Sequence, residues 1–340
     1  APFFDALAAA GPPGVSVFAG QPRPEEAIET RAELSRAQFH AARNLHLGRG
    51  GQYLCYQQGL LRWLQQWDPQ ALIVEANPRY LSTPAALRWM HARQRPVIGW
   101  GLGAPASGAA FADLRGAVRR GFLSQFDALI TYSGQGAREY ARLGYPAARV
   151  FVAPNAAAPR PTHPLPERPL MLAPHQMTLL FVGRLQARKR VDLLLQACGS
   201  LPRGMQPHLW IVGDGPERAN LEQIARQVYP KTLFLGARQG AELARIFLAA
   251  DLFVLPGTGG LAVQQAMAYG LPVIVAEADG TQTDLVRARN GWQLPPGDVD
   301  ALQRHLMEAL ADCSRLRGMC AESYRIASEE INLERIVTVF

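Results

Sequence analysis

The sequence predicts an α/β protein made of two doubly wound, Rossmann-like domains. Short apolar runs alternate with helical patterns along most of the chain, and a proline-rich stretch interrupts this alternation near the middle. The 340 residues are enough for two domains of ordinary size. Hydrophobic residues make up 48% and charged residues 19%, a composition that argues against disorder. We expect a cleft between the domains, with ligands at the carboxyl ends of the strands.

The pattern divides the chain into four parts. Residues 1–155 form the first domain, with strands expected at 15–19, 71–75, 96–100, 128–132 and 150–153, and helices expected at 53–67 and 135–143, among others. Residues 156–177 read as a proline-rich linker. The second domain is expected over residues 178–325, with strands at 179–182, 209–212, 232–235, 252–255 and 272–276. Residues 326–340 are expected to form a C-terminal helix that could return to the first domain.

The start of the chain departs from the usual order of elements. A helical pattern at residues 3–10 precedes the first apolar run, at 15–19. A doubly wound half normally begins with a strand at the centre of its sheet, and without that strand the core would hold unpaired backbone. We therefore expect that the first strand is missing and that about 10–20 residues precede Ala1 in the natural protein.

Charge and cysteine content limit the possible partners. Residues 1–158 hold 16 arginines, no lysine and 10 acidic residues, a net charge of +6 out of +7 for the chain. This excess suggests an anionic partner, such as a phosphorylated substrate or a membrane surface, although a generally basic surface explains it equally well. No module that binds nucleic acid is recognisable.

The four cysteines have no metal spacing and read as reduced thiols of a cytoplasmic protein. No histidine pattern indicates a metal site.

The strongest local motif lies between a strand and a helix of the second domain. Gly183 ends an apolar run, a short basic loop follows, and a helical pattern begins near Val191. Helix N-termini in this position bind phosphate, and Arg184 and Lys189 would add two positive charges. Lysine fills only 2 of 35 basic positions in this chain, so a lysine at 189 suggests that a compact ammonium is needed there.

The motif Gly183-Arg184-Leu185-x-x-x-Lys189 resembles the phosphate motif of GT-B glycosyltransferases of family 4. Residues 211–217, 233–236, 250–256 and 265–274 resemble the following segments of that family, and residues 127–133 and 152–155 resemble its last N-terminal strands. The resemblance is good over roughly residues 125–300 and loose over 1–125. It implies a metal-independent enzyme that transfers a sugar from a nucleotide-diphosphate sugar, UDP-sugar in the first place, usually with retention.

The resemblance also assigns roles to residues. Arg184 and Lys189 would stabilise the charge of the leaving diphosphate and so be catalytic. The residues expected to bind the donor are Gly183, Arg184, Lys189, Gly213, Arg238, Gly257, Thr258, Gly259, Gly260, Leu261 and Gln265. Those expected on the acceptor side are Glu75, Trp100 and Gly101. Glu75 could equally cap the next helix, and Arg238 could equally be a surface residue.

Three positions depart from the family pattern. Gly257 and Gln265 stand where relatives often carry two glutamates, and Leu102 stands near a frequent histidine. Gln265 could still bind a ribose hydroxyl, whereas Gly257 loses one contact to the donor. Because leucine cannot transfer protons, another residue or the donor's own leaving phosphate must take the acceptor proton. These losses leave open a catalytically weakened protein that only binds a sugar nucleotide.

The same loop supports a rival interpretation. Gly257-x-Gly259-x-x-Ala262 follows a strand and opens a helix, and Glu277 lies 20 residues after Gly257. Taken alone, this is the fingerprint of a dinucleotide site, so an NAD-dependent oxidoreductase is the alternative class of enzyme. The fingerprint normally sits on the first strand of its domain, whereas here it follows the fourth.

The expected acceptor is a glycan or a lipid-linked glycan of a bacterial surface polysaccharide or glycolipid. The helix expected over residues 111–125 carries Arg115, Arg119 and Arg120, which could touch anionic lipid, although a solvated helix face explains them as well. We expect a cytoplasmic protein that could associate peripherally with the inner face of the plasma membrane.

Overall fold

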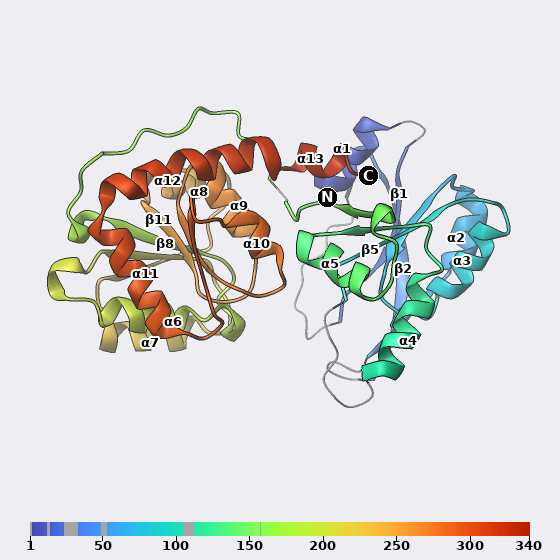
Figure 1. Cartoon of the computed structure of the whole chain (residues 1–340), viewed down its shortest axis with the longest axis horizontal. Coiled ribbons are helices and arrows are strands. Elements are labelled where there is room, and N and C mark those ends of the chain that lie inside the picture. The colour runs from blue at the N-terminus through green and yellow to red at the C-terminus, as the bar shows by residue number, and fades with distance from the viewer. Residues whose placement is uncertain (1, 12–13, 24–32, 49–52, 105–111, 157) are drawn as a thin grey trace. The chain divides into compact units, whose positions relative to one another are not determined.

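The computed structural model describes residues 2–11, 14–23, 33–48, 53–104, 112–156 and 158–340. They fall into two compact units, shown in Figure 1: the N-terminal unit (residues 1–154 and 336–340) and the C-terminal unit (residues 155–335). Each unit contains parallel strands connected through helices, which confirms the predicted fold class. In the part of the chain that the structure describes, no helix is long and apolar enough to span a bilayer.

The C-terminal unit is built on a six-stranded sheet in the order β10-β9-β8-β11-β12-β13, with neighbouring strands parallel. The chain starts centrally at β8, moves outward to β10 and then returns past β8 to β11. This is the doubly wound order, with its switch point between β8 and β11. The strands are β8 (Thr178–Val182), β9 (His208–Val212), β10 (Thr232–Gly236), β11 (Leu252–Leu255), β12 (Val273–Ala276) and β13 (Gly291–Leu294).

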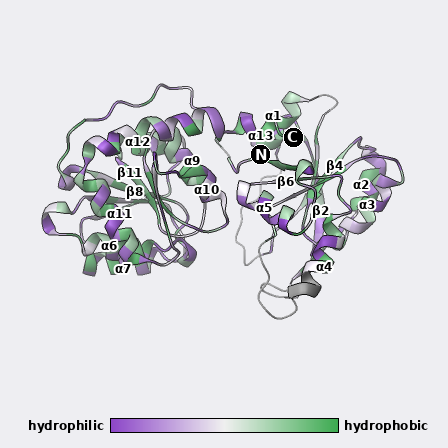
Figure 2. Cartoon of the chain, in the orientation of Figure 1, coloured by the Kyte–Doolittle hydropathy of each residue, from purple (hydrophilic) through white to green (hydrophobic). Residues whose placement is uncertain are grey.

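Helices pack around this sheet (Figure 1). One group brings α6 against α7 and α11, and another brings α9 against α12. Figure 2 shows hydrophobic residues along the central strands β8 and β11, and every residue of β11 and β12 is buried. The helices are α6 (Val191–Gly199), α7 (Arg218–Val228), α8 (Gly240–Ala249), α9 (Leu261–Ala268), α10 (Thr281–Leu285), α11 (Val299–Ala311) and α12 (Cys313–Arg325), which continues as a π-helical turn (Ile326–Glu330) before α13 (Leu333–Val337).

The proline-rich segment belongs to the C-terminal unit for most of its length. The Arg168 guanidinium donates hydrogen bonds to the carbonyl oxygens of Leu248 (2.8 Å), Ala250 (2.6 Å) and Tyr269 (3.0 Å). The His163 ring stacks on Tyr269 with 4.9 Å between ring centroids. Side-chain contacts therefore fix this segment, since it contains almost no regular secondary structure.

The N-terminal unit contains a four-stranded parallel sheet in the order β4-β5-β6-β7. Its buried cluster includes Trp63, Leu64, Met90, Phe122 and Tyr140. The strands are β4 (Leu72–Glu75), β5 (Val97–Gly101), β6 (Ala128–Thr131) and β7 (Val150–Val152), and the helices of the unit are α1 (Pro2–Ala10), α2 (Leu60–Trp67), α3 (Thr83–His91), α4 (Ala112–Leu123) and α5 (Gly134–Arg142). The C-terminal residue Phe340 lies against Phe3 and Trp100 of this unit.

A second sheet of the N-terminal unit corrects one prediction. It pairs β1 (Ser16–Gly20) in parallel with β2 (Gln38–Leu47), and β2 antiparallel with β3 (Leu54–Gln58). The sequence predicts a helix over residues 53–67, but its first part is β3, and Gly59, with φ +90°, separates this strand from α2. The residues of β3 alternate in burial, but the sequence Tyr53-Leu54-Cys55-Tyr56 is continuously apolar. No period-two alternation therefore distinguishes this strand from the apolar helix that follows it. Within the described residues, β1 and β4 are edge strands of their sheets, and the expected additional first strand stays a prediction.

Candidate functional site

The predicted donor residues gather at the carboxyl edge of the C-terminal sheet. Gly183 follows β8, Gly213 follows β9, and residues 257–260 follow β11, on either side of the switch point. A Cβ atom on Gly213 would lie 1.9 Å from the carbonyl oxygen of Gly183, so these two strand ends touch through backbone. Only glycine fits at Gly213, which also has φ +136°. The glycine at position 213 thus allows the ends of β8 and β9 to come into close contact.

Lys189 lies at the centre of this edge. It ends a 3₁₀ turn (Ala187–Lys189), just before α6, and its Nζ donates a hydrogen bond of 2.7 Å to the carbonyl oxygen of Thr258. Burial, together with the neighbouring Arg188 cation, lowers the pKa of the Lys189 ammonium to about 8, although the Asp279 carboxylate opposes the shift. A partly desolvated ammonium held in this way interacts strongly with an anion.

Backbone contacts bind the Lys189 turn to the glycine loop (residues 257–260). The Thr258 amide donates to the carbonyl oxygen of Arg188 (3.0 Å), and Arg188 Nη1 donates to Thr258 Oγ1 (3.1 Å). A Cβ atom on Gly257 would lie 2.3 Å from the carbonyl oxygen of Arg188 and 2.6 Å from that of Lys189. Glycine at 257 is therefore required by the close approach of two backbone segments, so a glutamate cannot be placed there without moving them.

The helix after this loop presents its N-terminus at the same edge. Gly260 is the N-cap of α9 and provides no side-chain cap, so the first amides of the helix are left for another acceptor. Gly259 has φ +141°, and a Cβ atom there would lie 2.3 Å from Lys189 Nζ. Leu261, the first residue of α9, is 48% exposed. An uncapped helix N-terminus beside a lysine ammonium suits a phosphate group.

A third segment, which the sequence analysis did not single out, completes the site. After β12, Asp279 Oδ1 accepts hydrogen bonds from Thr281 Oγ1 (2.6 Å) and from the Thr281 amide (3.2 Å). On the next residue, Gln282 Nε2 donates to the carbonyl oxygen of Gly259 (2.9 Å). The signal that could have revealed this segment is its polar sequence, Asp-Gly-Thr-Gln, which begins shortly after the buried strand β12.

The other predicted donor residues lie around this centre. Gln265 is partly buried on α9, whereas its neighbour Gln264 is fully buried and accepts a hydrogen bond from the amide of Ala158 (3.1 Å). Arg184 is exposed, directly after Gly183. Arg238 is exposed after β10, and its guanidinium lies 3.4 Å from the Glu242 carboxylate. These positions fit the periphery of the site.

Two family models match most of the chain. One, described as glycosyl transferases group 1, matches residues 176–312, and the other, described as a glycosyl transferase 4-like domain, matches residues 3–156. The chain belongs to the group 1 glycosyltransferases. The strand ends, the Lys189 turn and the uncapped helix α9 all fall within the first of these matches.

Curated relatives agree with this family. The glycosyltransferase is 41% identical over 125 residues to a GDP-mannose-dependent alpha-mannosyltransferase of Mycobacterium tuberculosis, covering 35% of this chain and 30% of that protein. It is 33% identical over 150 residues to a lipopolysaccharide core biosynthesis glycosyltransferase of Rhizobium meliloti, covering 42% of each. It is 32% identical over 154 residues to a sulfoquinovosyl transferase of Arabidopsis thaliana, covering 43% of this chain and 28% of that protein. The matches thus span less than half of these relatives.

Solved structures share the GT-B fold with this glycosyltransferase. A sucrose-phosphate synthase of Thermosynechococcus elongatus has a TM-score of 0.70 at 20% identity, covering 99% of this chain and 89% of that one. A lipopolysaccharide outer core galactosyltransferase has a TM-score of 0.63 at 17% identity, covering 83% and 77%. An Anabaena protein solved in complex with UDP has a TM-score of 0.64 at 19% identity, covering 82% and 79%. Family membership favours a transferase over the alternative oxidoreductase.

The predicted acceptor-side residues of the glycosyltransferase lie in its N-terminal unit. Glu75 and Trp100 are paired neighbours on β4 and β5, and Glu75 is exposed and accepts a hydrogen bond from Asn77 Nδ2 (3.0 Å). The Trp100 ring packs in an aromatic cluster, with centroid distances of 5.2 Å to Tyr132 and 4.9 Å to Phe340. Trp100 therefore packs within the N-terminal unit and also lies near the carboxyl end of β5.

Gly101 has a packing reason of its own. A Cβ atom there would lie 2.6 Å from Tyr140 Oη, so glycine lets the Tyr140 ring come close to β5. Burial, reinforced by the Glu75 carboxylate, raises the pKa of Tyr132 to about 12, so this phenol is neutral at physiological pH. Leu102 is 52% exposed just after Gly101.

Among the described residues, no group of three or more histidine, cysteine, aspartate and glutamate side chains is arranged to hold a metal ion.

Proposed function

We propose that this glycosyltransferase binds a nucleotide-diphosphate sugar at the carboxyl edge of β8 and β11 and transfers the sugar, with retention, to a glycan or lipid-linked acceptor. The observation that carries the proposal is the position of Lys189: a partly desolvated ammonium joined to the glycine loop, next to the uncapped N-terminus of α9. Both groups attract anions, and a diphosphate has two anionic groups to offer them.

The chemistry follows from charge. As the bond between the anomeric carbon and the phosphate oxygen breaks, negative charge grows on the diphosphate, and Lys189, Arg184 and the helix N-terminus stabilise it. The acceptor hydroxyl oxygen forms the new bond on the same face of the sugar. Its proton goes to an oxygen of the leaving phosphate, since Leu102 offers no proton-accepting group. In this proposal the basic side chains take the place of a metal ion.

The donor and acceptor are proposed at the level of chemical class. UDP-sugar is the expected donor, and the relatives named as GDP-mannose-dependent make a GDP-sugar the alternative to test. The relative from lipopolysaccharide core synthesis supports a bacterial surface glycan or glycolipid as the product. The basic N-terminal half supports peripheral action at the inner face of the plasma membrane, with exposed Arg120 on α4 as one contact with anionic lipid.

The proposal is tested with a panel of UDP- and GDP-sugars, with and without EDTA. Release of nucleoside diphosphate is measured, and proton NMR gives the anomeric configuration of the first product. We expect turnover of one donor, unaffected by EDTA, with the configuration of the donor retained. Inversion, or loss of turnover in EDTA, would contradict the mechanism. Binding of a nucleoside diphosphate without turnover of any donor would favour the catalytically weakened protein.

A further inference from the structure

Gln282 is a buried glutamine whose amide is only half satisfied. It is 1% exposed on the first turn of α10, and its Nε2 donates a hydrogen bond of 2.9 Å to the carbonyl oxygen of Gly259. Its Oε1 is also buried and has no hydrogen-bond partner among the described residues. An unpaired buried oxygen costs stability, and this cost opposes what the single hydrogen bond to Gly259 contributes. Packing alone therefore does not explain why a glutamine occupies position 282.

Among the described residues, two side chains donate hydrogen bonds to backbone carbonyl oxygens of the glycine loop, and Gln282 is one of them. Lys189 Nζ holds the carbonyl oxygen of Thr258, and Gln282 Nε2 holds the next carbonyl oxygen along the chain. A trans peptide places its carbonyl and its N–H on opposite sides. The Gly260 amide, which shares a peptide with the Gly259 carbonyl, therefore points away from Gln282. This amide lies next to the uncapped first turn of α9.

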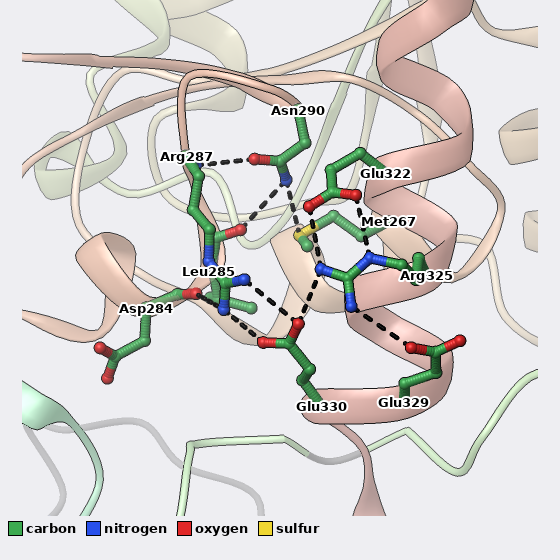
Figure 3. Close-up of polar contacts among 9 residues, drawn as sticks. All are labelled: Met267, Asp284, Leu285, Arg287, Asn290, Glu322, Arg325, Glu329 and Glu330. Atoms are coloured by element: carbon green, nitrogen blue, oxygen red, sulfur yellow. Dashed lines mark hydrogen bonds and ion pairs between the residues drawn. The ribbon is translucent and has the colours of Figure 1, made fainter.

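Helix α10 is itself held firmly, as Figure 3 shows for its carboxyl end. Asn290 Nδ2 donates to the carbonyl oxygen of Leu285 (3.1 Å), and Asn290 Oδ1 accepts from the Arg287 amide (2.7 Å). The Arg287 guanidinium pairs with Glu330, which also pairs with Arg325 of α12. At its other end, the Asp279 turn fixes where the helix begins. The Gln282 side chain therefore extends from a short helix that is fixed at both ends.

We propose that Gln282 is a positioning residue for the donor diphosphate. It holds the Gly259–Gly260 peptide so that the Gly260 amide and the first turn of α9 face the anion, and it acts through Gly259 without touching the donor. This inference rests on the proposed function, because it requires a diphosphate at the glycine loop. It also explains how a loop with no side chain at Gly257 keeps a defined conformation.

The test compares Gln282→Met with Gln293→Met. Gln293, on β13, is a matched control because its Nε2 also donates to a backbone carbonyl, that of Val286 (2.6 Å) at the carboxyl end of α10. Its removal tests the anchoring of α10 while the bond from Gln282 to Gly259 stays in place. Kd values for UDP, GDP and the corresponding monophosphates are measured by calorimetry, with KM and kcat for the donor and the Tm of the unliganded variants. Gln282→Glu serves as a second variant, since a carboxylate cannot donate to the Gly259 carbonyl.

We expect Gln282→Met to weaken diphosphate binding and raise the donor KM by about tenfold, with a smaller effect on the monophosphate, because an amide donor to the second phosphate is misplaced. Its Tm should change little, because removal of the unpaired oxygen offsets loss of the hydrogen bond to the Gly259 carbonyl oxygen. Gln293→Met should leave all Kd values unchanged. Diphosphate affinity equal to wild type in both Gln282 variants would overturn this inference alone. A loss of affinity matched by a general loss of stability, or failure of both variants to fold, would make Gln282 structural and also overturn it. Absence of diphosphate binding by the wild-type chain would overturn this inference and the proposed function together.

Discussion

The Lys189 ammonium lies 2.7 Å from the carbonyl oxygen of Thr258, so the cation of one loop is joined directly to the backbone of the other. These loops follow β8 and β11, the two strands that flank the switch point of the sheet. The contact places a positive charge beside the N-terminus of α9, and it ties the conformation of the glycine loop to the lysine. Substitution of Lys189 and substitution in the glycine loop should therefore affect the same function, the proposed binding of the donor.

Removal of the Lys189 charge should affect catalysis far more than folding. We expect Lys189→Ala to lower kcat/KM for the donor by about 10²-fold or more, because a single preorganised donor to the developing charge contributes that much. Lys231→Ala is the matched control, since Lys231 is the chain's one other lysine and is exposed just before β10. Steady-state kinetics and thermal melting separate the effects. Activity of Lys189→Ala within a few fold of wild type would remove the leaving-group role.

The lowered pKa of Lys189 predicts a pH dependence of donor affinity. Because burial brings this pKa to about 8, the ammonium loses its proton as the pH rises through that value, and diphosphate binding should weaken above it. Titration of the diphosphate Kd between pH 6.5 and 9.5 measures this. Lys189→Met should bind weakly with no inflection near pH 8. An inflection that persists in Lys189→Met would assign it to another group.

The same shift has the opposite sign for stability. The folded-state pKa lies below that of an unfolded lysine, so the buried charge disfavours folding while both states are protonated. This cost is lost as the pH rises from the folded-state value of about 8 towards the ordinary lysine value. The free energy of unfolding should therefore gain a small favourable contribution from Lys189 in that range. The difference between wild type and Lys189→Met in chemical denaturation at pH 7 and pH 10 isolates this contribution.

Gly257 should resist restoration of the glutamate that relatives often carry. A Cβ atom there overlaps the backbone of Arg188 and Lys189, so we expect Gly257→Ala to cost about 1–3 kcal/mol of stability and to weaken diphosphate binding, and Gly257→Glu to do at least as much. Gly318→Ala is the control, because it lies exposed on α12 with nothing within 4 Å and should stabilise the helix slightly. Higher donor affinity in Gly257→Glu would show that the two loops can separate at little cost.

Gln265 offers a test of the ribose contact. If it binds a ribose hydroxyl, Gln265→Ala should weaken donor binding by about 1–2 kcal/mol, and Gln265→Glu should be tolerated, because a carboxylate accepts the same hydrogen bond. The alternative is that this partly buried side chain only packs along α9. Calorimetry with the nucleotide, alongside thermal melting, distinguishes the two. Unchanged affinity in Gln265→Ala would exclude it from the site.

The sequence was sufficient to predict the strands that carry strong apolar runs and to place the phosphate loop, because both signals are local. The strand over residues 54–58 escaped prediction because the sequence Tyr53-Leu54-Cys55-Tyr56 is continuously apolar and shows no period-two alternation, and a helix of similar apolar content follows it after Gly59. The role of Gly257 also depended on structure: only the position of the Arg188 carbonyl oxygen explains why that residue has no side chain. Gln282 lies 23 residues from Gly259, and nothing in their local sequences indicates that the two touch.

The most direct test of the central claim, that the β8–β11 edge holds a nucleoside diphosphate through Lys189, is a thermal-shift measurement of the wild-type chain and Lys189→Ala with UDP, GDP, ADP, dTDP and NAD. Binding to the folded state raises Tm by mass action. We expect at least one nucleoside diphosphate to raise the Tm of the wild type, the same nucleotide to have little effect on Lys189→Ala, and NAD to have none on either. Stabilisation by NAD alone, or equal stabilisation of both chains by the diphosphate, would contradict the account.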